Sequence, residues 1–184
     1  PGTGTAATRR AMPDGEDWVA GRGTGPSRRG GAPLRVAVNA WFLDQPGTGS
    51  GQYLLGLLRG FAALGGEAEA PRFLLVAPPG VRRPDLPGLE VEWWSLAASA
   101  WQSNAGKVAF EQAIFPRVCR RWGADVAHVP YWGSPLWPAV PTVVTVHDLI
   151  PLLLPAYRGG PLVRLYSRLV AASARRAAMV LTDS

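Results

Sequence analysis

Two adjacent residues, His147 and Asp148, carry side chains that can do chemistry and directly follow a run of strand-forming residues at 142–146. An imidazole can donate a hydrogen bond to a substrate hydroxyl or stabilise charge that develops during a reaction. The structural alternative is a histidine bonded to backbone carbonyls and an aspartate that caps the next turn. Their position at the end of a strand with core-like composition favours functional roles for both residues.

A glycine-rich turn at 46–51, PGTGSG, runs into a helix-like segment. Gly47, Gly49 and Gly51 permit a close approach of the backbone to a ligand, and a helix N-terminus offers N–H groups and a partial positive charge that suit a phosphate. The spacing is neither the G-x-G-x-x-G of dinucleotide-binding folds nor a P-loop, because no Gly-Lys-Ser/Thr follows. A loop that only caps a helix explains the spacing equally well.

A third cluster, at 126–132, contains His128, Tyr131 and Trp132. A histidine at a strand end under a loop is more often structural than functional, and we expect this for His128. Two histidines and scattered carboxylates, without an H-E-x-x-H or comparable spacing, make a poor metal site. The sequence therefore predicts no metal.

These clusters lie in a chain in which strand-like and helix-like segments alternate. Strands are predicted at 34–40, 72–78, 89–94, 124–130, 141–149 and 178–184, and helices at 51–64, 106–123 and 160–177. Pro116 predicts a kink or break in the second helix. The alternation indicates an α/β fold, a Rossmann-like parallel sheet with helices on both faces, in which the apolar run at 143–146 is a central strand.

In such sheets, ligands bind outside the carboxyl ends of the strands. Residues 39–41 follow the first predicted strand, residues 128–132 follow the fourth, and His147 and Asp148 end the fifth. We therefore expect these three clusters to meet along one edge of the sheet.

Composition gives a broad class but not a partner. The chain has 184 residues, of which 47% are hydrophobic, as in a globular protein. Residues 1–32, rich in Gly, Arg and Pro, are predicted to be a disordered leader, and residues 33–184 an ordered domain. The net charge of +6 permits an anionic partner such as a nucleotide or a membrane. No nucleic-acid-binding motif occurs, so we expect no nucleic-acid partner.

The helix predicted at 160–177 is basic and amphipathic, with arginines beside leucines. Such a helix is usually a solvated surface helix, and it can also make a peripheral contact with an anionic membrane. No run of about 18 apolar residues occurs, so no spanning helix is expected. The lone cysteine, Cys119, suits a reducing compartment. We expect a cytoplasmic protein, at the inner face of the membrane if the peripheral contact is made.

Residues 34–184 resemble the amino-terminal domain of retaining GT-B glycosyltransferases of family 4, the group 1 or mannosyltransferase-like enzymes. The motifs that carry the resemblance are GTGSGQYLLGLL at 47–58, ADVAHVPYWGSPL at 124–136, TVVTVHDLIPLLLPAYRG at 142–159 and RRAAMVLTDS at 175–184. The resemblance implies two Rossmann-like domains that face each other across a cleft. The amino-terminal domain mainly binds the acceptor, and the carboxy-terminal domain mainly binds the nucleotide of the sugar donor.

The resemblance also implies roles for individual residues. The donor's phosphates and sugar would be bound by Gly47, Gly49, Ser50 and Gly51. His147 would contact the donor sugar near the reacting centre, with Asp148 holding the loop or touching an acceptor hydroxyl. Tyr131 and Trp132 would lie on the acceptor side. No metal or other cofactor is expected, because helix N-termini and basic residues hold the diphosphate in such enzymes.

The partners implied are a nucleotide-sugar donor and a glycan or lipid-linked acceptor. These residues contain no counterpart of the carboxy-terminal donor domain, so we expect a fragment that is inactive alone. The competing class is a non-catalytic, Rossmann-like module that binds a nucleotide or a glycan without turnover.

Overall fold

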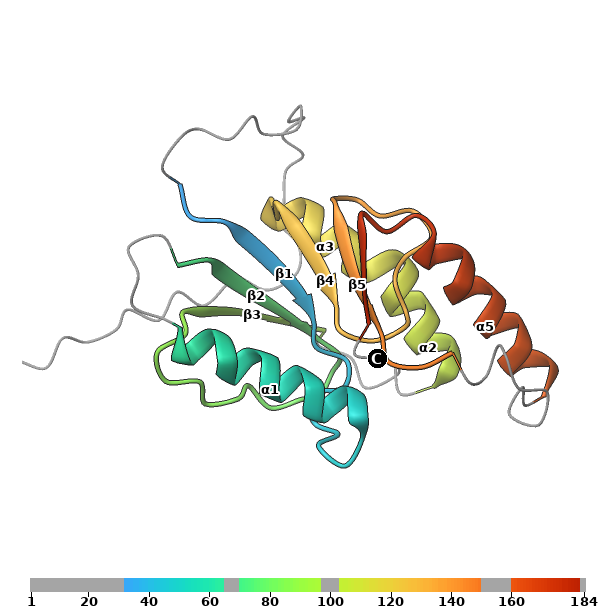
Figure 1. The fold of residues 1–184 in the computed structure, drawn as a ribbon, viewed down its shortest axis with the longest axis horizontal. Helices are drawn as coiled ribbons and strands as arrows, with labels where there is room; N and C mark the ends of the chain where they lie inside the picture. The colour runs from blue at the N-terminus through green and yellow to red at the C-terminus, as the bar shows by residue number, and fades with distance from the viewer. Residues whose placement is uncertain (1–31, 65–69, 97–102, 150–159, 183–184) are drawn as a thin grey trace, which may run out of the picture. The chain divides into compact units, whose positions relative to one another are not determined.

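The computed structural model describes residues 32–64, 70–96, 103–149 and 160–182 (Figure 1). The predicted leader lies outside these residues apart from Ala32, so its disorder stays a prediction. By their contacts, residues Gly31–Ser184 make up one unit, and the fold described below lies within it.

The described residues form a six-stranded sheet in which every pair of neighbouring strands is parallel. The strands are β1 (Arg35–Asn39), β2 (Arg72–Ala77), β3 (Val91–Ser95), β4 (Val126–Val129), β5 (Thr142–Val146) and β6 (Met179–Thr182), in the order β3-β2-β1-β4-β5-β6. Their Val-, Leu- and Ala-rich composition suits a sheet that is covered on both faces. The predicted Rossmann-like α/β fold is confirmed.

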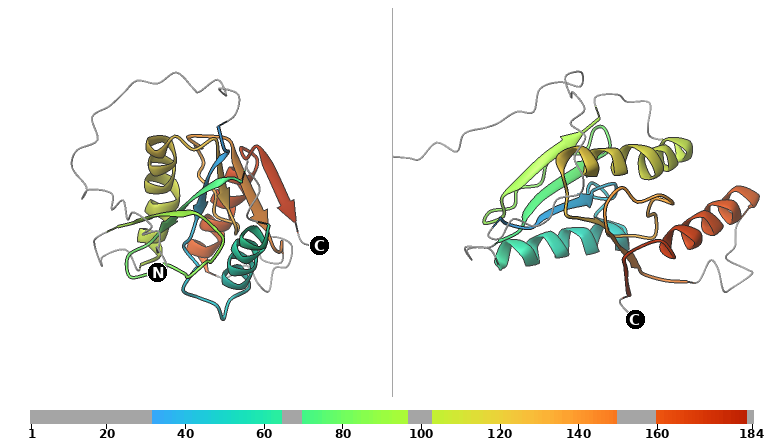
Figure 2. Two further views of the ribbon diagram at one scale, coloured as in Figure 1. Left: turned by 90° about the vertical axis from the view of Figure 1, so that its left-hand side faces the viewer. Right: turned by 90° about the horizontal axis from the view of Figure 1, so that it is seen from above.

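Helices cover both faces of this sheet (Figures 1 and 2). On one face lies α1 (Gly49–Ala63), whose Leu54 and Leu58 pack against strand residues such as Val38. The opposite face carries α2 (Asn104–Ala109), the π-helical turn η2 (Phe110–Ile114), α3 (Phe115–Trp122) and α5 (Pro161–Ala174). A second core lies there, built around Phe110 and Phe115.

The helix predicted at 106–123 changes its hydrogen-bond pattern just before Pro116. Proline lacks the N–H that would bond to the carbonyl of Gln112 in an α-helix, and its ring would crowd that carbonyl. Instead, the N–H of Phe115 reaches back to the carbonyl of Phe110, a π-type hydrogen bond. The predicted break is confirmed, as a π-helical turn between two α-helical segments.

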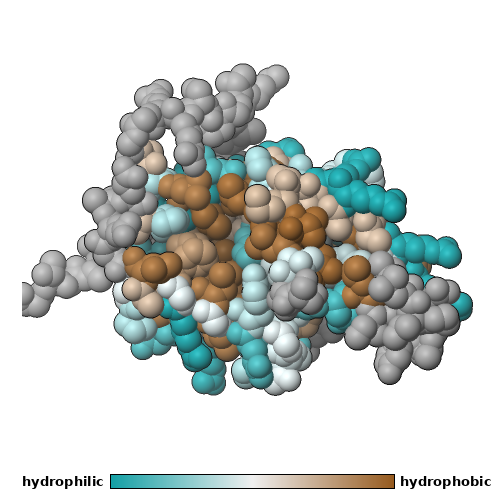
Figure 3. Space-filling model, in the orientation of Figure 1, coloured by the Kyte–Doolittle hydropathy of each residue, from teal (hydrophilic) through white to brown (hydrophobic). Residues whose placement is uncertain are grey.

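The fifth strand is shorter than predicted and lies inside the sheet. β5 ends at Val146, and it pairs with β4 on one side and with β6 on the other. The central strands are β1 and β4. Apolar residues are visible on the surface of the domain near β5 and β6 (Figure 3). Among them, Met179, Val180 and Leu181 of β6 are exposed. The prediction of an interior, buried strand at 143–146 is therefore confirmed, whereas the order of the strands is known only from the structure.

Candidate functional site

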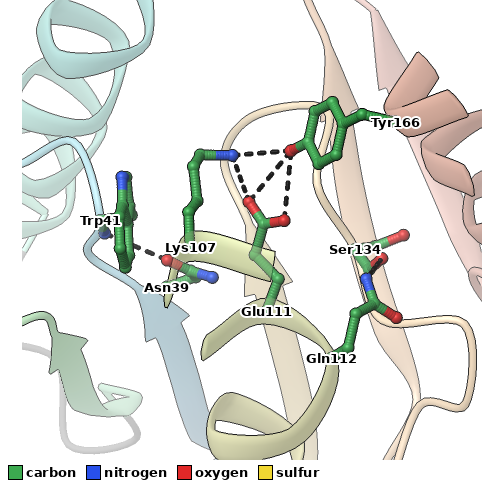
Figure 4. Close-up of polar contacts among 7 residues, drawn as sticks. All are labelled: Asn39, Trp41, Lys107, Glu111, Gln112, Ser134 and Tyr166. Atoms are coloured by element: carbon green, nitrogen blue, oxygen red, sulfur yellow. Dashed lines mark hydrogen bonds and ion pairs between the residues drawn. The ribbon is translucent and has the colours of Figure 1, made fainter. Parts of the chain in front are cut away.

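The ends of β1 and β4 form the topological switch point of the sheet. From β1 the chain runs outward through β2 to β3, and then returns to the other side of β1 to form β4. The loops that follow β1 and β4 therefore leave the sheet in different directions, which is where open α/β sheets bind ligands. Asn39 ends β1, and its Oδ1 accepts a hydrogen bond from the Trp41 N–H at 3.0 Å (Figure 4).

The glycine loop follows β1 and turns directly into α1. Thr48 is the N-cap of the helix: its hydroxyl accepts a hydrogen bond from the Gly51 N–H at 3.1 Å and donates one to the Gln45 carbonyl at 2.8 Å. The helix therefore begins at Gly49, two residues earlier than predicted. The N-cap accepts the hydrogen bond of the Gly51 N–H. The N–H groups of Gly49 and Ser50, also in the first turn, have no acceptor within the helix.

The glycines of this loop differ in the space around them. A Cβ on Gly51 would collide with the Gln45 carbonyl and would lie 2.8 Å from the carbonyl oxygen of Phe42, so close packing requires glycine there. A Cβ on Gly47 or Gly49 would meet nothing within 4 Å. The loop is thus open beside Gly49, and phosphate binding by this loop stays a prediction.

His147 lies one residue beyond β5 and is half-buried. Its Nε2 is 3.1 Å from the backbone carbonyl oxygen of Pro130, in the loop after β4. A carbonyl only accepts, so Nε2 carries the proton in this contact. The ring of Tyr53 from α1 packs edge-on against the imidazole, with centroids 4.8 Å apart. His147 thereby connects the end of β5 to the loop after β4 and to α1.

Both interpretations of His147 find support in this geometry. The hydrogen bond to a backbone carbonyl agrees with a structural role. The meeting of three segments at the carboxyl edge agrees with a functional role. Asp148 is exposed beside it. The catalytic roles of His147 and Asp148 stay predictions.

His128 lies in a buried chain of hydrogen bonds under the same edge. Its Nε2 is 3.0 Å from the Thr145 hydroxyl, which donates to the Tyr53 hydroxyl at 3.2 Å. Since the threonine proton is used toward Tyr53, the threonine oxygen accepts from the protonated Nε2 of His128. Burial lowers the pKa of His128 from 6.5 to about 4, so the imidazole is neutral at pH 7. Burial and neutrality are the properties of a structural histidine. The chain of hydrogen bonds also holds the Tyr53 ring in place beside His147.

The two predicted acceptor residues lie at different depths. Tyr131 is only 4% exposed, and its ring packs edge-on against Phe42 with centroids 4.8 Å apart. Trp132 is half-buried as a whole, and its indole N–H is itself buried without a hydrogen-bond partner among the described residues. Because part of Trp132 is exposed, Trp132 is better placed than Tyr131 to touch an acceptor, with Tyr131 as support beneath it. Acceptor binding by either residue stays a prediction.

A buried carboxylate that the sequence interpretation missed lies next to Tyr131. Glu111 of η2 has no exposed surface, and it forms an ion pair with Lys107 of α2 (Figure 4). The Tyr166 hydroxyl, from α5, lies 3.2 and 3.1 Å from the two carboxylate oxygens and 2.6 Å from the Lys107 ammonium nitrogen. Three segments of the chain thus share one polar cluster, Lys107–Glu111–Tyr166.

The surroundings of this cluster act differently on the two members of the ion pair. Burial raises the pKa of Glu111 above 4.5, and the charge of Lys107 opposes that rise. The Lys107 ammonium faces the rings of Tyr131 and Tyr166, each 4.9 Å from its centroid, and that of Phe42 at 5.6 Å. Such cation–π contacts stabilise an ammonium that has left water. The Tyr131 hydroxyl faces Glu111 and Asn39 without hydrogen-bond geometry to either, and burial together with the Glu111 charge raises its pKa.

The loop after β4 is shaped around this cluster. A Cβ on Gly133 would collide with the Tyr131 ring and would lie 2.6 Å from Oε1 of Glu111, so only glycine lets the loop pass over the carboxylate. Gln112 holds the next residues: its amide donates to the Ser134 carbonyl at 3.2 Å and accepts from the Leu136 N–H at 2.8 Å. The π-helical turn therefore presents Glu111 and Gln112 to the loop that carries Trp132.

One signal in the sequence pointed to this cluster. Lys107 and Glu111 are four residues apart in a predicted helix, and Lys107 is the one lysine in an arginine-rich chain. Pairs at this spacing are ordinarily solvent-exposed and contribute little. Tyr166, which is distant in the sequence, could not have been assigned to them by spacing.

Other parts of the described chain offer no competing centre near this edge. Among the described side chains, no three of His, Cys, Asp or Glu lie close enough to hold a metal ion. A surface hollow of about 380 Å³, lined by Arg83, Asp85 and Leu89 among others, precedes β3 at the opposite edge of the sheet. None of the described helices is long and apolar enough to cross a membrane. Transfer without a metal stays a prediction.

The chain matches the model of a known protein family. Residues 48–184 match the model of the family described as "Glycosyl transferase 4-like domain". The matched part begins at the N-cap of α1 and includes the glycines at 49 and 51, Glu111, the loop after β4, and His147. Among curated proteins, none matches this chain.

Proposed function

The chain belongs to the family of glycosyl transferase 4-like domains, and from this premise we propose that it is the acceptor-side domain of a retaining glycosyltransferase. The protein would move a sugar from a nucleotide-sugar to a glycan or lipid-linked acceptor, with a second domain holding most of the donor's nucleotide. The observation that carries the proposal is the convergence of the glycine loop, His147 and Trp132 on the carboxyl edge, around the switch point of the sheet.

The glycine loop would serve the donor's phosphates. The first-turn N–H groups of Gly49 and Ser50 point outward from a helix N-terminus, where an anion is stabilised by the helix dipole. No side chain blocks an approach to Gly49, since a Cβ there would meet nothing within 4 Å. Gly51 would contribute indirectly, by letting the loop pack closely enough to present its neighbours.

His147 would orient the donor sugar next to these phosphates. Its ring is held by the Pro130 carbonyl and by Tyr53, so its position is fixed before substrate binds. Fixed polar groups cost no reorganisation during the reaction, which is why preorganisation lowers a barrier. Asp148, exposed on the same strand end, would hold the adjoining loop or accept a hydrogen bond from an acceptor hydroxyl.

The acceptor would lie on the side of the loop after β4. The partly exposed Trp132 ring would offer an apolar face for a sugar ring. Tyr131, Glu111 and Gln112 would keep this loop in place from beneath.

The second candidate is a module that binds a nucleotide or glycan without turnover. The contact of His147 with a backbone carbonyl favours it, because a histidine used only for support makes such a contact. The same edge of the sheet would then bind the ligand with no chemical step.

The deciding experiment is an assay of nucleotide release by the full-length protein, with a panel of nucleotide-sugars and glycan or lipid-linked acceptors. His147→Ala should lower kcat by about a hundredfold if the imidazole acts on the transition state. Asp148→Asn should lower turnover as well, while Asp85→Asn, an equally exposed aspartate at the opposite edge, serves as the matched control. Each variant is checked for folding by thermal denaturation.

The outcomes separate the two candidates. Turnover that collapses in a folded His147→Ala variant supports the glycosyltransferase site. Nucleotide-sugar binding without turnover, by calorimetry, supports the binding module. Neither binding nor turnover with any donor, in a folded protein, rejects both.

A further inference from the structure

Helix α5 is tied to the loop after β4 by two sets of polar contacts. The first is a direct hydrogen bond near the end of the helix. The hydroxyl of Ser134, in the loop, donates to the hydroxyl of Ser173 at 3.1 Å, and Ser173 donates in turn to the Val170 carbonyl at 2.8 Å. Ser134 is 1% exposed and Ser173 has no exposed surface. Water cannot compete for a bond between buried hydroxyls, so this bond holds the loop against the last turn of α5.

The second set of contacts reaches the loop through Glu111, two helical turns before Ser173. The Tyr166 hydroxyl lies 3.2 and 3.1 Å from the two oxygens of the Glu111 carboxylate, and 2.6 Å from the Lys107 ammonium nitrogen (Figure 4). The loop passes over this same carboxylate at Gly133, where a Cβ would lie 2.6 Å from Oε1 of Glu111. Tyr166 therefore fixes the group on which the loop rests.

These contacts hold the loop next to Trp132. Gly133 and Ser134 follow Trp132 directly, and they are the loop residues that meet Glu111 and Ser173. On the other side of Trp132, the Pro130 carbonyl oxygen lies 3.1 Å from Nε2 of His147. The backbone on both sides of the partly exposed tryptophan is thus held from different elements of the fold.

The chemistry of the α5 contacts suits positioning. Apolar side chains can pack in more than one arrangement at little cost. Hydrogen bonds are directional, and a buried hydroxyl that loses its partner is costly. Contacts through the hydroxyls of Tyr166 and Ser173, two turns apart on one helix, therefore favour a single arrangement of α5 and the loop.

We propose that Tyr166 and Ser173 are positioning residues for the acceptor, which fix the loop after β4 so that the exposed part of Trp132 is in place before the acceptor binds. The proposal deepens the proposed function and rests on it, because it requires that this loop binds the acceptor. A side chain that is already fixed loses little conformational freedom on binding, and affinity is higher for that reason. Helix α5 would thus set the affinity for the acceptor through the loop.

The first test follows Trp132 without any substrate. The full-length protein is labelled with fluorinated tryptophan, and the fluorine resonance of Trp132 is assigned by its loss in Trp132→Phe. Tyr166→Phe and Ser173→Ala should each shift or broaden this resonance, because each removes one link between α5 and the loop. Ser167→Ala is the matched control and should leave the resonance in place. Its hydroxyl, also on the buried side of α5, bonds only within the helix, to the Val163 carbonyl at 2.9 Å.

The second test measures kinetic constants in the nucleotide-release assay. Tyr166→Phe and Ser173→Ala should raise the acceptor KM by about fivefold, the factor that corresponds to one ordinary hydrogen bond. The kcat and the donor KM should stay within about twofold of the wild type, because only acceptor binding is weakened. A general structural defect would lower the amount of active enzyme, and therefore kcat, with no change in the acceptor KM. Ser167→Ala should match the wild type, and thermal denaturation checks that each variant is folded.

A changed Trp132 resonance together with a raised acceptor KM, both absent in Ser167→Ala, supports the proposal. An unchanged resonance in folded Tyr166→Phe and Ser173→Ala overturns it, and so does a loss confined to kcat or an equal rise of KM in Ser167→Ala. With turnover by the wild type, those results leave the proposed function standing.

Two further outcomes concern the wild type itself. If it binds a glycan without turnover, the dissociation constant from calorimetry takes the place of KM, with the same fivefold expectation. If the folded wild type neither turns over nor binds a donor or an acceptor, the proposed function fails, and the acceptor role of Tyr166 and Ser173 fails with it.

Discussion

Acid should destabilise this domain through His128. The folded state holds the imidazole neutral, with a pKa lowered by burial from 6.5 to about 4, whereas the unfolded chain takes up a proton as the pH falls below 6.5. The unfolded state therefore binds more protons in this window. The free energy of unfolding should fall as the pH decreases from about 6.5 and level off below about 4, where both states are protonated.

The size of this effect follows from the pKa shift. A change from 6.5 to about 4 corresponds to about 3 kcal/mol, at 1.36 kcal/mol per pKa unit. His128→Asn removes the titration and keeps a polar side chain beside Thr145. At pH 7.5 the variant should lose only about 1 kcal/mol, the net worth of a typical buried hydrogen bond. At pH 4 it should be as stable as the wild type or more so.

Urea denaturation between pH 7.5 and 4, followed by tryptophan fluorescence, measures both proteins. Glu111 contributes the opposite slope, because its raised pKa makes the folded state bind more protons than the unfolded state above pH 4.5. Glu111 is present in both proteins, so it cancels in the difference between them. His147→Asn is the control, and it should keep the fall because His128 is intact. Parallel pH curves for wild type and His128→Asn would refute the assignment.

Three further predictions concern packing and burial. Gly51→Ala should lower the free energy of unfolding by about 1–3 kcal/mol, because the added Cβ collides with the Gln45 carbonyl. Gly49→Ala, where the Cβ meets nothing within 4 Å, should leave it unchanged. Urea denaturation measures both variants, and equal effects would contradict this reasoning. Glu111→Ala should lower the free energy of unfolding by about 3 kcal/mol, because it removes the ion-pair partner of Lys107. Glu111→Gln should lower it clearly less, since the amide can still form a hydrogen bond with Tyr166. A larger loss in Glu111→Gln than in Glu111→Ala would show that the ion pair is not the cause. The Cys119 thiol is buried, and burial raises its pKa to about 12. It should therefore react with a thiol reagent only as fast as the domain unfolds. Fast reaction in the native state would contradict its burial.

The order of the elements could be read from the sequence because their signals are local. Apolar runs of strand length and a 3.6-residue period in segments such as 51–64 depend only on neighbouring residues. Pro116 predicted the break before α3 for an equally local reason. In a parallel sheet, the carboxyl ends of all strands lie at one edge, so residues 39–41, residues 128–132 and His147 were correctly expected at the same edge.

The depth of the candidate residues could not be read in this way. Tyr131 and Trp132 are neighbours in sequence, yet one lies beneath the edge and the other is partly exposed on it. The family resemblance assigned Gly51 to phosphate binding, whereas in the structure glycine is required there because a side chain would collide with the Gln45 carbonyl. Burial depends on what the rest of the chain brings alongside, which adjacent residues do not encode.

The sequence by itself determined the α/β class, the alternation of strands and helices, and the edge at which polar residues gather. Tertiary structure alone decided the order of the strands, the link from His128 through Thr145 and Tyr53 to His147, and the contact of Glu111 with Tyr166. The physical reason is separation along the chain. Periodicity specifies which face of an element is buried, whereas pairs such as Glu111 and Tyr166 meet only after the helices have packed on the sheet, when burial makes their contacts obligatory.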